Sequence, residues 1–495
     1  ATSCGGNFDV NGDEDYTVDA YTGGAVRTVA HPSQQVRGYH DYLKNFVESI
    51  ITHQLELRGY AYCYNYNNEP GAALYDNIYD KILKEHRTFS GNETAEFAQV
   101  LHDALAKGDG FSIFNKMMQS PIRPSRKLLN EVGTMVSQGS TDAFSLLEDQ
   151  SVARNVILDK IRTSQKSVIL VQGGPGTGKT VIALRILAEL AKSETHFNAH
   201  YATKSASLLS GIKEQLPRGS RAKYLFSNIT SFNPHDFCEN ELDVLLVDEA
   251  HRIEKSTNNQ YTPAAKRTDL SMIDCLIRAA KVSVFFIDDL QGIRSAEIGS
   301  SSMIKEAAER LGVGFDSVEL KSQFRCNGSD NYLDWLEDVL YNKTVTHFFS
   351  KEEFDFQIFD DPKTLYETIV SKDAKPNGDT LTSARLTAGF CWPWSDKLDS
   401  EGNLVKDVRI GNFAIPWETH RLLPVKQIPK GYCQWFQWAF KPEGIKQCGC
   451  IYTAQWCQFD YVGVIIGPDL KMDPQSGKLV TDRSETKDPT LSRGN

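Results

Sequence analysis

The chain has 495 residues, of which 40% are hydrophobic and 24% are charged, and its formal net charge is −10. This length predicts two to four domains, and the composition is that of a globular protein with no stretch of the roughly 18–20 uninterrupted apolar residues that a membrane span needs. The acidic balance excludes a protein that coats nucleic acid by charge alone, although it leaves room for a local basic groove.

Residues 1–120 are expected to form a first unit. The chain begins ATSCGGNFDV, which lacks the basic and apolar regions of a secretory signal and lacks an initiator Met, as a processed or truncated chain would. A helix is predicted over 34–57, where apolar residues recur at steps of three and four. Residues 121–143 are interpreted as a linker, because two prolines interrupt regular structure there. The linker's basic residues form a solvated turn or contact phosphates; they are Arg123, Arg126 and Lys127.

From residue 144 onward, short apolar runs alternate with amphipathic helices. Buried strands are predicted over 167–172, 242–248 and 282–288, and a helix over 180–190. Continuous apolar strands that alternate with helices indicate an α/β fold with a parallel sheet covered on both faces. We expect one such domain over 144–315 and a second over 316–495, where six of the seven tryptophans lie between Trp392 and Trp456.

The segment GGPGTGKT fits the phosphate-loop pattern G-x-x-x-x-G-K-[ST] in full. It follows a predicted strand and opens a predicted helix, as the pattern requires. The glycines let backbone N–H groups point into one concavity, and the helix N-terminus adds positive charge. We expect Lys179 to reach the β- and γ-phosphates of ATP and the Thr180 hydroxyl to coordinate Mg2+. The expected nucleotide-binding residues of this loop are Gly173, Gly174, Pro175, Gly176, Thr177, Gly178, Lys179 and Thr180.

Two adjacent carboxylates, Asp248 and Glu249, open the sequence Asp-Glu-Ala-His directly after the strand over 242–247. A carboxylate at the C-terminal end of a parallel strand lies beside the phosphate loop. Asp248 is expected to hold the Mg2+ shell, and Glu249 to orient and deprotonate the attacking water. The pair therefore predicts an ATP hydrolase of the P-loop class.

Three further polar residues are assigned to the same site. Gln291 follows the third strand and is expected to sense the γ-phosphate or the attacking water. Arg325 is expected to act as an arginine finger from the second domain. Gln150 precedes the phosphate loop by one helix, and its side chain has the donor and the acceptor that reading an adenine edge requires. The alternatives are a loop amide, an ion-paired surface arginine and a helix-capping residue.

The order of these motifs along the chain, from Gln150 through the phosphate loop to Arg325, resembles that of superfamily 1 helicases. The resemblance is closer to the Schlafen-group-3-like DNA/RNA helicases of bacteria. The resemblance runs from about residue 120 to the C-terminus and is carried by LKSQFRCNGS at 320–329, FCWPWS at 390–395, GCIYTAQ at 449–455 and FDYVGVI at 459–465. It implies two RecA-like domains with ATP in their cleft and DNA or RNA, single-stranded, as partner. By resemblance, Thr203 and Lys204 lie on the nucleic-acid side, and Thr453 and Gln455 couple the ATP cleft to the strand. Candidate stacking platforms, with core packing as the alternative, are Trp392, Trp394, Trp435 and Trp438.

The N-terminal unit is similar to part of a RecB-type PD-(D/E)xK nuclease, because Gln35 and Tyr39 fit its last motif, Q-x-x-x-Y. Nuclease chemistry also needs an Asp and a Glu-x-Lys on preceding strands, and no Glu-x-Lys precedes Gln35. We therefore expect a small, partial nuclease-like α/β domain without assigned cleavage. Two departures from the family pattern concern the motor: Trp456 replaces a glycine after Gln455, and no final arginine motif precedes Asn495.

These patterns leave two hypotheses, an ATP-dependent helicase or translocase and a nucleotide-switched nucleic-acid-binding or defence protein without processive unwinding. A third hypothesis is a nuclease to which the ATPase is auxiliary; it would require Mg2+-dependent cleavage by residues 1–120. The ten cysteines show no disulfide framework, and Cys448 and Cys450 lack the second pair that a zinc site would need, so buried thiols and a cytoplasmic location are expected. DNA versus RNA, polarity and oligomeric state are left open.

Overall fold

The computed structural model describes residues 8–10, 16–22, 25–46, 49–50, 55–106, 108, 110–118, 146, 148–163, 165–192, 197–216, 221–258, 262–292, 296–321, 329–373, 383–455, 457 and 459–488. The chain divides into two compact units. Unit 1 comprises residues 1–125 and 141–158, and unit 2 comprises residues 126–140 and 159–495. Within unit 2 we call residues 165–321 the first lobe and residues 329–488 the second lobe.

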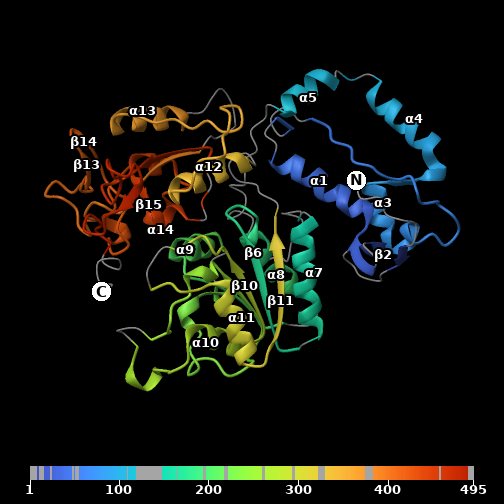
Figure 1. Ribbon diagram of the computed structural model, residues 1–495, viewed down its shortest axis with the longest axis horizontal. Helices are drawn as coiled ribbons and strands as arrows, with labels where there is room; N and C mark the ends of the chain where they lie inside the picture. Colours follow the sequence, from blue (N-terminus) through green and yellow to red (C-terminus); the bar gives the residue numbers. More distant parts are fainter. Residues whose placement is uncertain are drawn as a thin grey trace. The chain divides into compact units, whose positions relative to one another are not determined.

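Unit 1 contains two small sheets and several helices (Figure 1). The strands β1 (Phe8–Val10), β2 (Thr17–Thr22) and β3 (Ala25–Ala30) form an antiparallel sheet in that order. The strands β4 (Ala61–Cys63) and β5 (Thr88–Ser90) form a parallel pair. The helices are α1 (Pro32–Phe46), α3 (Asp80–Glu85), α4 (Thr94–Leu105), α5 (Gly110–Met118) and the first part of α7 (Glu148–Thr163). The helix predicted over 34–57 corresponds to α1 and to Ser49 and Ile50, which are also helical, whereas residues 55–57 are not helical.

The core of unit 1 lies between the antiparallel sheet and the chain segment that includes α3. It is formed by apolar side chains that are at most 8% exposed: Phe8, Val18, Ala20, Ala73, Leu74, Tyr79 and Ile82. Gln35, the first residue of the nuclease-like motif, donates from Nε2 to the carbonyl of Ala30 at 2.9 Å, and Tyr39 is exposed. Among the described residues, no group of three or more His, Cys, Asp or Glu side chains is arranged to hold a metal ion.

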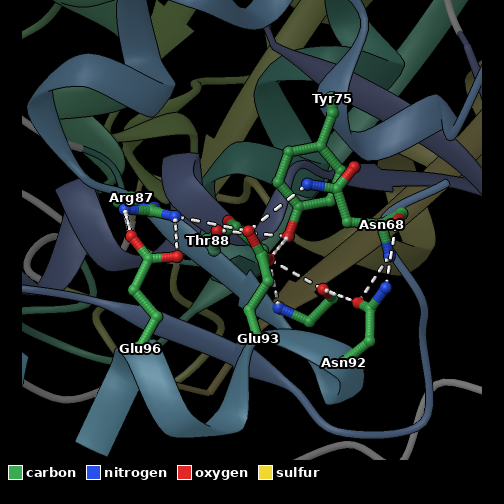
Figure 2. Close-up of polar contacts among 8 residues, drawn as sticks. Asn68, Tyr75, Arg87, Thr88, Asn92, Glu93 and Glu96 are labelled. Atoms are coloured by element: carbon green, nitrogen blue, oxygen red, sulfur yellow. Dashed lines mark hydrogen bonds and ion pairs between the residues drawn. The ribbon is translucent and has the colours of Figure 1, made fainter. Parts of the chain in front are cut away.

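A hydrogen-bond network around Glu93 ties the β4–β5 pair to the start of α4 (Figure 2). Glu93 Oε2 accepts from the Tyr75 hydroxyl at 2.7 Å, from Ser90 N at 2.9 Å and from Ser90 Oγ at 2.7 Å. Its Oε1 accepts from Asn68 and Arg87, both at 3.3 Å. Burial alone would raise the pKa of Glu93, but the hydrogen bonds from Tyr75 and Ser90 outweigh burial and lower the pKa to about 2.

The first lobe is built on a six-stranded sheet in the order β11-β6-β10-β9-β7-β8. The strands are β6 (Ser167–Gly173), β7 (Ala199–Thr203), β8 (Phe226–Asn228), β9 (Leu242–Asp248), β10 (Ala280–Ile287) and β11 (Gly314–Leu320). Every neighbouring pair is parallel. The helices are α8 (Lys179–Lys192), α9 (Ala206–Gln215), α10 (Met272–Ala279) and α11 (Ser301–Arg310), with the end of α7. The predicted α/β fold is confirmed.

Both faces of this sheet are covered. Val168 and Leu170 of β6 belong to a core cluster that includes α10 and α11, and the intervening Ile169 and Val171 are fully buried as well. The helix α8 contacts β7, β9 and β10, and Figure 1 shows these helices flanking the strands. Burial on both faces explains why the strands are continuous apolar runs rather than alternating ones.

The first sheet extends further along the chain than expected. β11 pairs with β6 along its whole length, from Gly314 to Leu320, so the first lobe continues past residue 315, where the sequence pattern placed the domain boundary. β11 was missed because it alternates exposed and half-buried residues, as an edge strand does, and it lacks the apolar run of the central strands.

The second lobe contains a three-stranded parallel sheet in the order β15-β12-β16. The strands are β12 (Ala384–Ala388), β15 (Cys448–Cys450) and β16 (Tyr461–Ile465). Two antiparallel hairpins pair β13 (Val408–Ile410) with β14 (Phe413–Ile415) and β17 (Leu470–Met472) with β18 (Leu479–Thr481). The helices are α12 (Asp330–Leu340), α13 (Pro362–Lys372) and α14 (Ile451–Ala454).

Tryptophans organise the core of the second lobe. Trp417 and Trp438 are 2% and 0% exposed, and Trp438 Nε1 donates to the carbonyl of Gln447 at 3.0 Å. Trp392 and Trp394 are half-buried, pack against the cluster around Trp417 and donate to backbone carbonyls. Trp438 is therefore a core residue and presents no face for stacking, which corrects one of the four platform candidates.

A buried carboxyl group, Glu418, lies beside β15. Its Oε1 accepts from Thr453 Oγ1 at 2.7 Å and from Cys450 N at 3.3 Å, whereas Oε2 is buried with no hydrogen-bond partner among the described residues. Burial raises the pKa of Glu418 to about 7, although the Thr453 hydrogen bond opposes part of this increase. The side chain therefore lies close to the balance between its neutral and ionised forms at neutral pH.

Glu93→Gln is expected to lower the free energy of unfolding at neutral pH by about 1–2 kcal/mol, since the amide replaces a charged acceptor in a partly buried network. The folded pKa is about 2 and the ordinary value is 4.5. A lowered folded pKa stabilises the protein above pH 4.5, and this contribution is lost as the pH falls toward 2. Urea unfolding at pH 7 and at decreasing pH measures the difference from wild type. The control is Glu96→Gln in the first turn of α4, which removes an exposed partner of Arg87 and should change stability little.

Glu418→Gln is expected to remove a pH dependence of the opposite sign. The folded pKa of about 7 lies above the ordinary 4.5, so the stability that the neutral carboxyl group provides is present below pH 4.5 and is lost as the pH rises to about 7. The wild type should lose about 3 kcal/mol across this window and the variant should not. Thermal unfolding between pH 4.5 and 8 tests this, with the exposed Glu401→Gln as control. An unchanged pH profile in Glu418→Gln would contradict it.

Candidate nucleotide site

The phosphate-loop residues form the turn between β6 and α8. β6 ends at Gly173 and α8 begins at Lys179. Gly176 and Gly178 have φ angles of 86° and 87°, which side chains rarely adopt. A Cβ atom on Gly173 would lie 2.5 Å from Thr177 Oγ1, so this position also requires glycine. Gly174 and Pro175 complete the turn, and buried Thr177 donates to the Gly174 carbonyl at 3.0 Å. The loop geometry therefore fits a phosphate cradle.

Lys179 lies over this loop. Its Nζ donates to the carbonyl oxygens of Gly173 at 2.6 Å and Gly174 at 2.8 Å. These contacts keep the ammonium group at the mouth of the turn, where the backbone N–H groups of the helix start also gather.

Asp248 ends β9 and is held by two hydroxyl groups. Its Oδ2 accepts from Thr180 Oγ1 at 2.7 Å and from Tyr201 OH at 2.6 Å. Burial raises the pKa of Asp248, and the neighbouring charge of Glu249 raises it further, while the two hydroxyl groups and Lys179 oppose this. A hydroxyl and one carboxylate are the protein ligands that Mg2+ commonly uses, with water completing the shell, so the pair fits a magnesium site.

Glu249 is fixed in an unusual backbone conformation. Its φ and ψ are 57° and 47°, in the left-handed region, directly before the 3-10 turn Ala250–Arg252. Its Oε2 lies 2.9 Å from Nε2 of buried His251. A non-glycine residue held in this region costs free energy and often marks a functional site. The turn directs the Glu249 side chain away from the line of β9 while Asp248 stays in the sheet.

The strand order brings Gln291 close to this chemistry. β10 lies between β6 and β9, so the residues after β10 emerge between the phosphate loop and Asp248. Asp288 follows β10 directly and is buried, and Gln291 Nε2 donates to Asp288 Oδ2 at 2.9 Å. Asp289 accepts from Gln172 at 3.2 Å.

The assignments of Arg325 and Gln150 as nucleotide contacts stay predictions. Arg325 lies outside the described residues, as does Trp456. Gln150 is buried on α7, in the part of that helix that belongs to unit 1.

Thr203 and Lys204 lie inside the first lobe. Thr203 ends β7 directly beside Asp248 and is 0% exposed. Lys204 forms an ion pair with Glu254, and its Nζ lies 4.0 Å from Glu297 Oε1, with only 11% of the side chain exposed. Both side chains are therefore engaged inside the protein, in contrast to the expected surface that grips a phosphate backbone.

Gln455 and Thr453 follow β15 in the second lobe. Gln455 Oε1 accepts from Arg252 Nη1 of the first lobe at 2.9 Å, and Thr453 donates to Glu418. Gln455 thus contacts the segment that begins with Asp248 and Glu249, whereas Thr453 is buried within its own lobe.

Three residues of this region were not anticipated: Tyr201, Arg252 and Glu297. In the sequence, Tyr201 has the pattern of a core residue in a buried strand, so its hydrogen bond to Asp248 could not be anticipated. Glu297 is distant in sequence from its partners. Only Arg252 carried a signal, since it directly follows the Asp-Glu-Ala-His sequence. The described cysteines have no disulfides, and Cys448 and Cys450 are buried thiols. No helix of the described residues is long and apolar enough to cross a membrane.

Comparison with solved structures gives similarity at low sequence identity. The Candida albicans Pif1 helicase is 14% identical with a TM-score of 0.26, covering 49% of this chain and 51% of that chain. A structure of two coordinating Pif1 helicases at forked dsDNA is 17% identical with a TM-score of 0.26, covering 49% and 54%. AMPPCP-bound DnaA from Aquifex aeolicus is 15% identical with a TM-score of 0.22, covering 45% and 57%. The chain thus spans about half the length of these structures.

Sequence comparison covers more of the chain. It is 23% identical over 406 residues to the uncharacterized protein YPL245W of Saccharomyces cerevisiae, covering 72% of this chain and 83% of that protein. Residues 166–495, which include the phosphate loop, Asp248, Glu249 and both lobes, match the family described as Schlafen group 3, DNA/RNA helicase domain. The chain therefore belongs to the Schlafen group 3 DNA/RNA helicase domain family.

Proposed function

We propose that this protein is an ATP-dependent helicase or translocase that hydrolyses Mg-ATP in the first lobe and acts on single-stranded DNA or RNA. The observation that carries the proposal is the hydrogen bond of 2.7 Å between Thr180 and Asp248. Thr180 directly follows the glycine-rich turn, and Asp248 directly precedes Glu249. The phosphate loop after β6 and the proposed metal ligand and base after β9 are then at the same edge of one parallel sheet. The family match supports the nucleic-acid partner.

In the proposed reaction, Lys179 exchanges its two carbonyl acceptors for the β- and γ-phosphate oxygens of ATP, and Thr180 and Asp248 hold Mg2+. The ion, when bound, neutralises charge that develops on the phosphates. Glu249 orients the attacking water and accepts its proton. We assign γ-phosphate sensing to Gln291 and transition-state stabilisation to Arg325.

Because Thr203 and Lys204 are engaged inside the first lobe, we propose that other surfaces contact the nucleic acid. We assign coupling between ATP and strand to Gln455, because it joins the second lobe to the segment after Glu249. The same buried arrangement favours the second candidate, a nucleotide-driven switch that binds nucleic acid without processive unwinding. The two candidates share the ATP chemistry and differ in whether hydrolysis moves the strand.

Lys179→Ala and Glu249→Gln are expected to reduce ATP hydrolysis by about 100-fold or more, which is the usual range for loss of a general base or of a charged phosphate contact. Lys179→Ala should also weaken nucleotide binding, whereas Glu249→Gln should retain it because the amide keeps the shape and leaves the phosphate loop intact. Phosphate release and binding of a fluorescent ATP analogue measure the two effects. The matched controls are Lys305→Ala and Glu306→Gln, which are exposed on α11 of the same lobe and should hydrolyse ATP normally. Wild-type rates in the two site variants would refute the assignment.

Nucleic acid is expected to stimulate the wild-type ATPase at least about fivefold, the lower end of typical coupling between two sites. Single-stranded DNA and RNA oligonucleotides are compared at fixed salt, because phosphate contacts make binding salt-dependent. A strand-displacement assay on forked duplexes is run with the same protein. Displacement that Glu249→Gln abolishes supports the motor. ATP-dependent binding without displacement supports the switch, and an ATPase indifferent to every nucleic acid contradicts both.

A further inference from the structure

Four charged side chains form a neutral cluster at the segment 248–254, which we call the Walker B loop and which itself supplies two of the four. The cluster consists of Lys204, Arg252, Glu254 and Glu297. The Arg252 side chain is 4% exposed and the Glu297 side chain is 0% exposed, with Arg252 Nε 3.1 Å from Glu297 Oε1. Two cations balance two anions, so the cluster remains neutral although it lies inside the protein.

Backbone contacts attach Glu297 to the Walker B loop. Ile298 N and Gly299 N both donate to the carbonyl of Ile253, at 2.7 and 3.1 Å. A Cβ atom on Gly299 would lie 2.1 Å from the carbonyl oxygen of Ala250, so the two segments touch where only glycine fits. A displacement of the Walker B loop therefore displaces Glu297 with it, since close-packed backbones move together.

Arg252 extends from this cluster to the second lobe. While Nε donates to Glu297, Nη1 donates to Gln455 Oε1 at 2.9 Å, and the guanidinium carbon lies 6.0 Å from the ring centroid of Tyr452. Tyr452 also accepts at its carbonyl from Ser207 Oγ of α9 at 3.1 Å. Gln455 directly follows the short helix α14, which begins after β15. The residue after His251 thus holds the end of α14.

A purely structural salt bridge would need only one of these contacts. Replacing either charge would leave an uncompensated charge inside the protein, but this cost does not require that Arg252 reach across to Gln455. A guanidinium group offers separated nitrogens in a rigid plane, which suits two acceptors on two elements, whereas a lysine carries the same charge on a single nitrogen. The two-sided contact is therefore the feature that distinguishes a positioning residue from a structural ion pair.

We propose that Arg252, fixed by buried Glu297, is a positioning residue that transmits the nucleotide state of the Walker B loop to Gln455 and α14 in the second lobe. The inference rests on the proposed function, because it assumes that a nucleotide binds at the phosphate loop. Nucleotide binding repositions Asp248 and Glu249, the adjoining turn carries Arg252 with it, and the guanidinium group pulls or releases the Gln455 side chain. The link is a defined pair of hydrogen bonds, and it acts before any nucleic acid is bound.

The test is hydrogen–deuterium exchange of the full chain with and without Mg2+ and a non-hydrolysable ATP analogue. The reporter is the amide of Gln455, which donates to the Ile451 carbonyl at 3.2 Å, together with its neighbours in 451–455. In the wild type, nucleotide should change the exchange rate of this segment at least about fivefold. Arg252→Lys keeps the cluster neutral and should abolish the change while leaving analogue affinity and melting temperature near wild type. Gln455→Leu should do the same, and Gln455→Glu, which retains the acceptor, should preserve the response.

The matched control is Arg310→Lys, which alters an exposed arginine of the first lobe that pairs with Asp274 and should leave the response intact. If the analogue binds and 451–455 does not respond in the wild type, or still responds in Arg252→Lys, the inference is overturned. If the analogue does not bind the wild type at all, the proposed ATPase function fails first, and this outcome is recognised from the binding measurement alone. The double variant Arg252→Lys with Gln455→Leu should be no less responsive than either single variant, because both changes break the same hydrogen bond between residues 252 and 455.

Discussion

The carboxylate of Asp248 joins two strands and one helix of the first lobe by hydrogen bonds. It accepts hydrogen bonds from Thr180, at the start of α8, and from Tyr201, on β7, while it belongs itself to β9. A carboxylate buried without such donors would be expensive, so the two hydroxyl groups and the nearby Lys179 allow it to remain there. The phosphate loop, the sheet register and the left-handed Glu249 are all arranged around this single group.

The order of the strands in the sheet determines which residues surround Asp248. Because β10 separates β6 from β9, Gln291 and Asp288 emerge between the phosphate loop and the Walker B loop. Backbone strain at Glu249 then turns the chain sharply, so that the side chains of His251 and Arg252 lie in the protein within four residues of Asp248. A short stretch of chain thus carries the proposed metal ligand, the proposed base and the contact to the second lobe.

Both lobes contain buried ion pairs, such as Arg252 with Glu297 in the first lobe and Arg385 with Asp373 in the second. Two buried carboxyl groups are held by hydroxyl donors instead: Asp248 accepts from Thr180 and Tyr201, and Glu418 accepts from Thr453. Burial raises the pKa of both groups, that of Glu418 to about 7. Stability should therefore respond to the protonation of Glu418 near neutral pH.

The sequence alone determined the α/β class, the central strands β6, β9 and β10, and the glycine-rich turn between β6 and α8, while the roles of Lys179, Asp248 and Glu249 stay predictions. These features are local: glycines, a lysine and an apolar strand act within a few residues of one another, so their spacing reveals them. The domain boundary predicted at residue 315 was wrong, because β11 crosses it. β11 is an edge strand, and its pairing with β6 depends on a long-range register.

Only the tertiary structure decided the roles of the residues that meet across the fold. Lys204 fits a phosphate contact by its place in a motif, yet it pairs with Glu254, fifty residues later. Tyr201 and Glu297 carry no pattern of their own, because a buried hydrogen bond is defined by its partner's position in space rather than in the chain. Spacing along the sequence reveals groups of residues that lie within one turn or one strand. Contacts between β7 and β9, or between Arg252 and Gln455, form only when the sheet and the lobes pack.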